Sequence, residues 1–435
     1  MNRAVFFPVL FFLAARGALA AGALPDSSLE GRLAAHVRFL SSPTLAGREA
    51  GSEGERAAAE YIAGRFLEIG LSAIGAGDAP GSFLHTFAVG AEGRIEGCAA
   101  GDEPFVPAKR MGNVIGAVDP DREGRVLVIG AHYDHLGMKD GVMHPGADDN
   151  ASGVALLIET ARAFARENPH EGPVVFAAFT GEEAGLLGSR AYVCRPPVPL
   201  SEAAAMVNVD MVGRLGGGPL LVAVAGLLEE ARDSLAALLP ADPPTLEMRS
   251  GYEAGDLASF AGARVPSMML FTGPHADYHR PTDTEEKIDY EGLARVTRFA
   301  REAAPLFARL ARGFHGEGVS SGAPPPDRER PFLGTLPDFS VPAGDGVLVA
   351  SVAPGSPAES AGVLPGDLVT GVGGHAVRDL AGYAAALRAH RPGDRVWIRI
   401  RRGAETLVLE AVLARRETPP EGAAGHPAGA REGGR

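Results

Sequence analysis

The chain has 435 residues, of which 46% are hydrophobic and 22% charged, and its formal net charge at pH 7 is −13. This length predicts two domains and a large core, and the composition excludes both a disordered chain and a membrane-embedded one. The negative charge leaves no broad basic surface, so the sequence argues against nucleic acid or an anionic membrane as a partner.

Residues 1–20 have the pattern of a secretory signal peptide. A basic start at Arg3 precedes an apolar stretch over residues 4–15, and the segment ends in Ala18-Leu19-Ala20, a small-x-small cleavage pattern. A membrane span needs about 20 apolar residues, and Arg16 interrupts the stretch before that length is reached. The sequence therefore predicts an exported protein, periplasmic or secreted, with no stable membrane span.

Export would allow the two cysteines, Cys98 and Cys194, to form a disulfide, but their spacing alone leaves this pairing open.

The elements that follow alternate between helical and strand-like patterns. Apolar residues at helical spacing predict opening helices near residues 29–40 and 58–69, and short apolar runs then alternate with helical stretches. This alternation predicts an α/β domain with a mixed, mostly parallel sheet and helices on both faces. The predicted strands are residues 125–131, 173–179, 205–209, 220–224 and 267–271, and the later helices are residues 152–166 and 290–312.

The composition changes after this first domain, which we expect to span residues 21–312. Residues 313–327 are rich in Gly, Ser and Pro and are typical of a linker. Residues 328–416 return to short β-type runs with Gly turns, which predicts a small, mainly β domain. Residues 417–435 are expected to be a disordered tail.

Side chains that can bind metals follow the predicted strands at their C-terminal ends. His132, the pair Glu182 and Glu183, Asp210 and His279 lie after four different strands, and the segment 146–150, which contains Asp148, precedes a helix. Open α/β sheets bind ligands at this edge, so we expect these side chains to converge.

Histidine and carboxylate ligands without cysteine favour a catalytic zinc or a similar divalent ion. Five ligands exceed the needs of one ion but suit two ions about 3.5–4 Å apart that share a carboxylate, which leaves Glu182 as a candidate general base. Each segment alone could be a surface histidine, a helix cap or a charged turn, and only their joint occurrence indicates a site. The remaining histidines, including His135 and His275, are expected to be structural.

These segments resemble those of the M28 zinc peptidases, in the order of that family, over residues 29–312. The resemblance also includes Gly47-Arg48 and Gly51-Ser52 near the start of the domain. The segments that carry it are Ala131-His-Tyr-Asp-His-Leu-Gly137, Gly146-Ala-Asp-Asp-Asn-Ala-Ser-Gly153, Gly181-Glu-Glu183, Asn208-Val-Asp-Met211 and Tyr278-His-Arg-Pro-Thr-Asp-Thr284.

The resemblance implies two Zn²⁺ ions per chain bridged by Asp148. His132 and Asp210 would complete one site, and Glu183 and His279 the other.

The resemblance also implies that Glu182 is the general base, and that Asp134 accepts a hydrogen bond from the second ring nitrogen of His132. The chain departs from the family at residues 255–260, where many relatives have Ser-Asp-His, so side-chain preference is the least defined feature. No insertion before His132 is long enough for the lid domain that some relatives have.

Residues 346–352 and 354–367 are similar to the PDZ domains of bacterial exported proteases. Phe332, Leu333, Gly334 and Thr335 occupy the position of the carboxylate-binding loop, and residues 380–389 the position of the helix beside the peptide groove. The resemblance implies a module that binds a peptide or protein partner by adding a strand to its sheet. Alternatively, this domain only packs on the first one.

The leading hypothesis is an enzyme that removes N-terminal residues from peptide substrates. The alternatives are a carboxypeptidase or dipeptidase on the same core, a glutaminyl cyclase with a single zinc, and a non-catalytic peptide-binding scaffold. The preferred residue, the PDZ ligand, the native metal beyond zinc and the oligomeric state are left open by the sequence.

Overall fold

The computed structural model describes most of residues 28–415. The predicted signal peptide, the predicted tail and nearly all of the predicted linker lie outside the described residues. Among the described residues, no helix is both long and apolar enough to cross a membrane. The described ranges are residues 28–75, 81–90, 93–98, 107–225, 233–235, 237, 246–250, 255–273, 275–313, 331–338, 346–353, 355–378 and 380–415.

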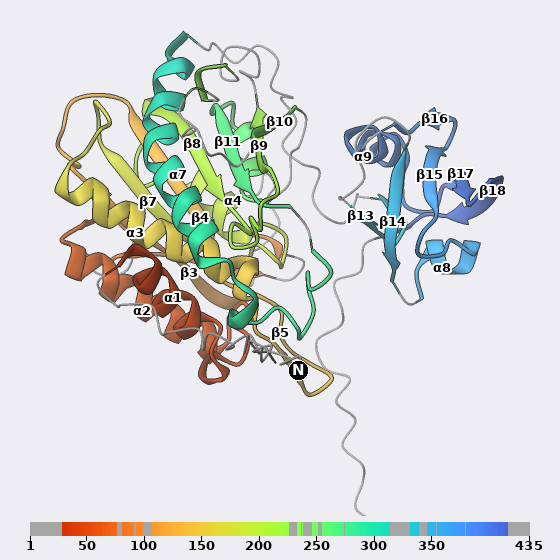
Figure 1. The fold of residues 1–435 in the computed structure, drawn as a ribbon, viewed down its shortest axis with the longest axis horizontal. Helices are drawn as coiled ribbons and strands as arrows, with labels where there is room; N and C mark the ends of the chain where they lie inside the picture. Colours follow the sequence, from red (N-terminus) through yellow and green to blue (C-terminus); the bar gives the residue numbers. More distant parts are fainter. Residues whose placement is uncertain are drawn as a thin grey trace, which may run out of the picture.

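A nine-stranded sheet forms the centre of the first domain (Figure 1). Its order is β1-β3-β7-β4-β8-β11-β9-β10, with β2 paired to β3. The central strands β7, β4, β8 and β11 are parallel to one another, whereas β3 and β9 join them in the antiparallel direction. The strands are β1 Ser72–Ala73, β2 Leu84–Gly90, β3 Pro107–Val118, β4 Val126–His132, β7 Val174–Phe179, β8 Ala203–Val209, β9 Leu220–Ala225, β10 Leu246–Ser250 and β11 Ser267–Phe271.

Helices cover both faces of this sheet, because the buried strands are apolar on both sides. In β4, Leu127 and Ile129 belong to the core under α1, α2, α3 and α7, whereas Val126 and Val128 belong to the core under α4 and α6. The predicted fold class is thus confirmed. The helices are α1 Leu29–Leu40, α2 Glu53–Ile69, α3 Gly153–Arg166, α4 Leu187–Cys194, α6 Leu257–Gly262 and α7 Tyr290–Leu310.

Local sequence signals set the ends of the long helices. Ser28, Ser52 and Asp289 are the N-caps of α1, α2 and α7, and each side chain accepts a hydrogen bond from a backbone N–H of the first turn. Gly70 ends α2 in the left-handed conformation, which a residue without a Cβ adopts without strain.

A disulfide joins Cys98 to Cys194, with 5.6 Å between the Cα atoms. It connects the segment after β2 to the last residue of α4, and it answers the question that the sequence left open.

The second domain is a separate antiparallel sheet with its own hydrophobic core. Its order is β13-β14-β15-β17-β18, so β13 lies at one edge, and β16 pairs with β15. A two-stranded ladder of β12 and β19 brings the two ends of the domain together. The elements are β12 Pro331–Phe332, β13 Thr335–Asp338, β14 Val347–Val352, α8 Pro357–Ala361, β15 Leu368–Val372, β16 His375–Ala376, α9 Leu380–Arg388, β17 Arg395–Arg402, β18 Glu405–Val412 and β19 Ala414–Arg415.

Candidate metal centre

Four adjacent parallel strands deliver the polar side chains to one edge of the large sheet. His132 is the last residue of β4, Asp210 directly follows β8, and Glu182 and Glu183 follow β7 within four residues. His279 lies in the segment between β11 and α7. Because the carboxyl ends of parallel strands meet at the same edge, residues far apart in the chain come together here.

Asp149 lies between two histidines. Its Oδ1 is 3.3 Å from Nε2 of His132, and its Oδ2 is 3.2 Å from Nε2 of His279. Nε2 of His132 is also 3.3 Å from Oδ1 of Asp210, and Nε2 of His279 is 3.1 Å from Oε2 of Glu183. One carboxylate therefore connects two groups of potential ligands.

His135 joins this cluster, although it was expected to be structural. Its Nδ1 is 2.9 Å from Oε1 of Glu183 and 3.7 Å from Oδ2 of Asp149. Two sets of ligand atoms within 4.8 Å of one another result, His132 with Asp149 and Asp210, and His135 with Asp149 and Glu183. The signal that was missed is the spacing of His135, three residues after His132 on the same strand-end loop.

Asp148 does not reach the cluster, which corrects the position expected from the family resemblance. Its Oδ1 accepts a hydrogen bond from the backbone N–H of Gly213 at 2.6 Å, and its Oδ2 is 3.1 Å from Nε2 of His275. Both oxygens are thus engaged by Gly213 and His275. The neighbouring residue, Asp149, occupies the shared position instead.

The unpaired atoms of the cluster fit bound cations. Nδ1 of His132 lies 3.2 Å from the carbonyl oxygen of Asp134, which can only accept, so this nitrogen carries the proton. In a neutral ring, the lone pair of Nε2 then faces two carboxylate oxygens, an arrangement that a cation between them stabilises. Oδ2 of Asp149 and Nε2 of His279 are buried and make no hydrogen bond to the described residues. Imidazole and carboxylate donors of this kind suit zinc.

The pKa shifts of the cluster show how strongly its charges depend on one another. Burial alone would lower the pKa of His132, but the charge of Asp210 and the nearby carboxylates of Asp134 and Asp149 raise it well above its usual range. Burial would raise the pKa of Asp149, yet the surrounding histidines lower it well below its usual range. The histidines and carboxylates of the cluster thus stabilise each other's charged forms.

Glu183 and His279 show the same compensation between burial and neighbouring charges. The pKa of Glu183 falls to about 2 against the effect of burial, because His135 hydrogen-bonds to it and His279 lies in ion-pair contact with it. The pKa of His279 rises to about 10 against burial, because it contacts Asp149 and Glu183.

Asp134 orients the loop after β7 rather than the ring of His132. Its Oδ1 accepts the backbone N–H of Glu182 at 3.0 Å, and its Oδ2 accepts that of Glu183 at 3.3 Å. Its carboxylate is 3.7 Å from Nδ1 of His132, which is beyond hydrogen-bond distance, and its backbone carbonyl makes that contact. The expected hydrogen bond from His132 thus goes to the main chain of Asp134.

Glu182 faces the cluster from the side of the segment 255–260. A Cβ atom on Gly255 would lie 3.5 Å from Oδ2 of Asp210 and 3.8 Å from Oε1 of Glu182, so both carboxylates lie beside Gly255. Burial, together with the charges of Glu183, Asp256 and Asp210, raises the pKa of Glu182 well above its usual range, although His132 lowers it. A carboxylate with a raised pKa beside a metal centre is suited to accept a proton.

Two polar contacts fix the loop that carries Asp149. The backbone N–H groups of Asp148 and Asp149 both donate to Oδ2 of Asp283, at 2.9 and 3.1 Å. The fully buried Arg48 donates to the carbonyls of Pro145 and Gly146, at 2.8 and 3.0 Å, from the other side. These contacts give a physical role to Arg48 and to Asp283, which the sequence marked only as parts of motifs.

Of the four predicted loop residues of the second domain, the first three precede the edge strand β13 and Thr335 is its first residue. Leu333 is buried, and its carbonyl accepts the N–H of Ala358 at 2.8 Å. Gly334 has φ +90°, and Thr335 contacts the Tyr383 hydroxyl of α9 through its own hydroxyl. Phe332 ends β12.

Two regions of the chain each match the model of a known family. Residues 113–304 match the model of peptidase family M28, and residues 330–413 match that of the PDZ domain. The chain thus has a central region that is similar to M28 peptidases and a C-terminal region that is similar to PDZ domains.

Individual relatives agree with this classification. Leucine aminopeptidase 1 of Arthroderma otae is 28% identical over 214 residues, which cover 45% of this chain and 57% of that protein. Leucine aminopeptidase 1 of Neurospora crassa is 30% identical over 251 residues, which cover 50% and 62%. This chain therefore spans less than two thirds of the length of these curated relatives.

A glutaminyl cyclase of Porphyromonas gingivalis has a similar structure. Its TM-score is 0.50 at 19% identity, and the match covers 64% of this chain and 97% of that one. At this identity, the likeness concerns the fold alone.

Proposed function

We propose that this protein is an exported metallopeptidase that removes N-terminal residues from peptides with the help of two zinc ions. The observation that carries the proposal is the position of Asp149, whose two oxygens face His132 on one side and His279 on the other. A shared carboxylate between two groups of nitrogen and oxygen ligands is the arrangement that two-metal hydrolases need.

The ligands divide into two sets around Asp149. His132 and Asp210 would complete the first zinc site, and Glu183 and His279 the second. His135 would hold Glu183 in place through its hydrogen bond of 2.9 Å. Each set leaves coordination positions open for water and substrate, as catalytic zinc sites require.

The reaction needs a base, and Glu182 is placed to be one. Bound zinc ions supply Lewis acidity and lower the pKa of water toward neutrality. Glu182 accepts the proton of the attacking water and returns it to the leaving amine. Asp134 positions this carboxylate because it holds the backbone of Glu182.

Two features support action on N-terminal residues with apolar side chains. The two relatives described above are named leucine aminopeptidases. An apolar cluster that includes Met211, Leu257 and Phe271, with Tyr278 packed against it, adjoins the centre in sequence, since Met211 follows Asp210 and Tyr278 precedes His279. An apolar substrate side chain would find matching surface there.

The test is digestion of matched peptides with free and N-acetylated termini, with and without a chelator. We expect release of the first residue from free peptides, no cleavage after acetylation, and loss of activity with the chelator. Cleavage that is unchanged by acetylation would rule out aminopeptidase action and leave a carboxypeptidase or another peptidase.

Glutaminyl cyclisation is an alternative reaction, and the metal content of the protein distinguishes it from hydrolysis. About two zinc ions per chain favour hydrolysis, whereas about one would favour cyclisation, and the two ligand groups around Asp149 support two. A peptide with N-terminal glutamine is the direct substrate for this comparison.

We further propose export through the signal peptide at residues 1–20 and peptide binding by the PDZ domain. The edge position of β13 supports the second proposal, because an extended peptide could pair with that edge. Fractionation of cells that express the full chain tests export, and binding of C-terminal peptides to the purified chain tests the PDZ domain.

A further inference from the structure

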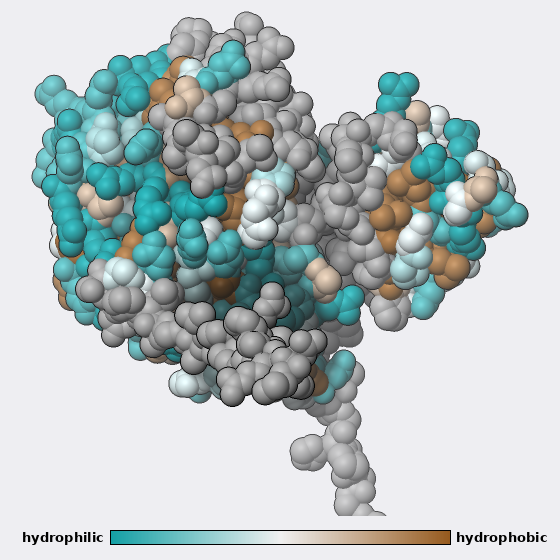
Figure 2. All heavy atoms as spheres, in the orientation of Figure 1, coloured by the Kyte–Doolittle hydropathy of each residue, from teal (hydrophilic) through white to brown (hydrophobic). Residues whose placement is uncertain are grey.

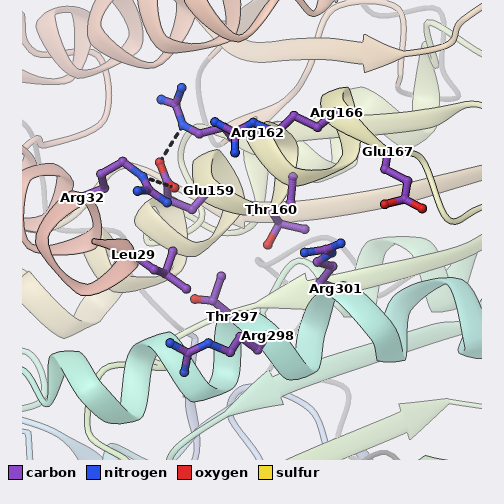
Figure 3. A pocket seen from close by; sticks show the side chains of 11 residues that line it. Leu29, Arg32, Glu159, Thr160, Arg162, Arg166, Glu167, Thr297, Arg298 and Arg301 are labelled. Atoms are coloured by element: carbon purple, nitrogen blue, oxygen red, sulfur yellow. Dashed lines mark hydrogen bonds and ion pairs between the residues drawn. The ribbon is translucent and has the colours of Figure 1, made fainter. Parts of the chain in front are cut away.

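A pocket away from the metal centre lies on the helical face of the first domain, between α1, α3 and α7 (Figure 3). It has a volume of about 280 Å³, and five arginines and two glutamates line it. A local surplus of positive charge is unexpected in a chain whose net charge is −13. In the view of Figure 2, the surface over this part of the molecule is mostly hydrophilic.

Part of this positive charge is already neutralised within the protein. Glu159 is buried and accepts from Arg32 at 2.7 Å and from Arg162 at 3.0 Å. Arg298 pairs with Glu30 at 2.7 Å. These pairs account for three of the five arginines.

The other two arginines, Arg166 of α3 and Arg301 of α7, make no hydrogen bond or ion pair within the part of the chain that the structure describes. In Figure 3, Arg301 extends from α7 toward Thr160 on the opposite wall. Two helices therefore present unpaired guanidinium groups to one pocket.

Thr160 adds an independent observation. Its side chain is 1% exposed, and its hydroxyl has no hydrogen-bond partner among the described residues although it lines the pocket. Thr297, on the facing helix, instead donates to the carbonyl of Leu293 at 2.7 Å. A buried hydroxyl without a partner is costly, and a ligand in the pocket would provide the missing acceptor.

We propose that this pocket binds a phosphate group, as free phosphate or as a small phosphate monoester. A dianion would match two unpaired arginines, since guanidinium groups bind phosphate oxygens through paired N–H donors. The Thr160 hydroxyl would donate to the same group. A bound anion would connect α3 and α7 on the face of the sheet that these helices cover.

Titration calorimetry of the purified full chain at constant ionic strength tests this proposal. The probes are inorganic phosphate and glycerol 3-phosphate, at up to about 10 mM, where a millimolar site is mostly occupied. Saturable binding of either probe with one site per chain is expected, and the ratio of the two affinities distinguishes free phosphate from an ester. No heat of binding with either probe would overturn the proposal.

Two variants and one control test whether these residues bind the anion. Arg301→Gln should weaken binding by about tenfold or more, since it removes a charged hydrogen-bond donor. Arg309→Gln is the control, because Arg309 lies on the same helix outside the pocket and is exposed. Equal affinity in the Arg301 variant and the control would overturn the proposal.

Thr160→Val separates ligand binding from folding. The substitution keeps the shape of the side chain and removes a hydroxyl that has no partner, so thermal stability without phosphate should stay equal or rise. The stabilisation by phosphate should decrease. Unchanged stabilisation by phosphate would contradict the role of this hydroxyl.

Discussion

At the scale of single residues, the centre depends on which of two adjacent aspartates faces the histidines. The sequence presents Asp148 and Asp149 as equivalent carboxylates, and the family resemblance alone favoured Asp148. Their directions are set by Asp283, 134 residues further along the chain, which accepts both backbone N–H groups. A contact between residues so far apart in the chain cannot be predicted from the spacing of residues within one motif.

For the other predicted ligand residues, the prediction depended mainly on where the predicted strands end. His132, Asp210 and the glutamate pair each follow a predicted strand, so the parallel sheet brings them to one edge. His279 contacts the cluster from the segment between β11 and α7, eight residues beyond the last residue of its strand.

Replacing Glu182 by glutamine tests the base directly. We expect Glu182→Gln to reduce turnover by roughly 10²–10⁴-fold, because the amide cannot accept the proton of water. The zinc content should stay unchanged, since Glu182 belongs to neither ligand set. Glu202→Gln, at an exposed site, is the control. Substantial activity in the Glu182 variant would assign the base to another group.

At the scale of elements, buried polar contacts join the helices and loops around the centre. Arg48 alone donates to the carbonyls of Leu40, Tyr133, Pro145 and Gly146, which lie on three different segments. Burial lowers its pKa to about 10, so it remains charged at neutral pH.

Arg48→Met should therefore destabilise the peptidase domain by about 3 kcal/mol or more, because it leaves several buried carbonyls unpaired. Denaturant unfolding measures this effect. Arg56→Met, at an exposed ion pair on α2, should change stability by less than about 0.5 kcal/mol. Similar stabilities of the two variants would contradict the role of Arg48.

Glu159 connects α1 to α3 and predicts a pH dependence. Burial would raise its pKa, but hydrogen bonds from His36, Arg32 and Arg162 lower it to about 2, from 4.5 in the unfolded chain. A depressed pKa stabilises the fold above pH 4.5, and this stabilisation is lost as the pH falls toward 2. The shift corresponds to about 3 kcal/mol.

The difference in unfolding free energy between the protein and its Glu159→Gln variant should thus be largest at neutral pH and shrink below pH 4.5. Denaturant titrations over that range measure it. A difference that is constant with pH would show that packing, rather than charge, explains the effect of the substitution.

The central strands were predicted within two residues at each end, because their continuous apolar runs are typical of buried parallel strands. The strand β3 was not predicted, since Lys109, Arg110 and Asn113 interrupt its apolar pattern. It is nevertheless paired on both sides, with β2 and β7. Tertiary pairing outweighs local propensity there.

At the scale of the whole molecule, the described residues before and after the Gly-, Ser- and Pro-rich segment at 313–327 form separate sheets with separate hydrophobic cores. All the proposed zinc ligands lie between residues 132 and 279, and the two hydrophobic cores share no residue.

A chain of residues 21–313 should consequently keep the zinc content and the activity on short peptides of the full mature chain. Activity on a dipeptide substrate and metal analysis measure this. Any dependence on the PDZ domain should be confined to long substrates or protein partners. Loss of zinc from the shortened chain would show that the second domain contributes to the centre.

The most direct test of the central claim is the zinc content of two neighbouring variants, Asp149→Asn and Asp148→Asn, measured by mass spectrometry on folded protein. The proposed centre predicts about two zinc ions in the unmodified chain, a large loss in the Asp149 variant, and near-normal content in the Asp148 variant, whose amide oxygen can still accept from Gly213. Full zinc content in the Asp149 variant would contradict it.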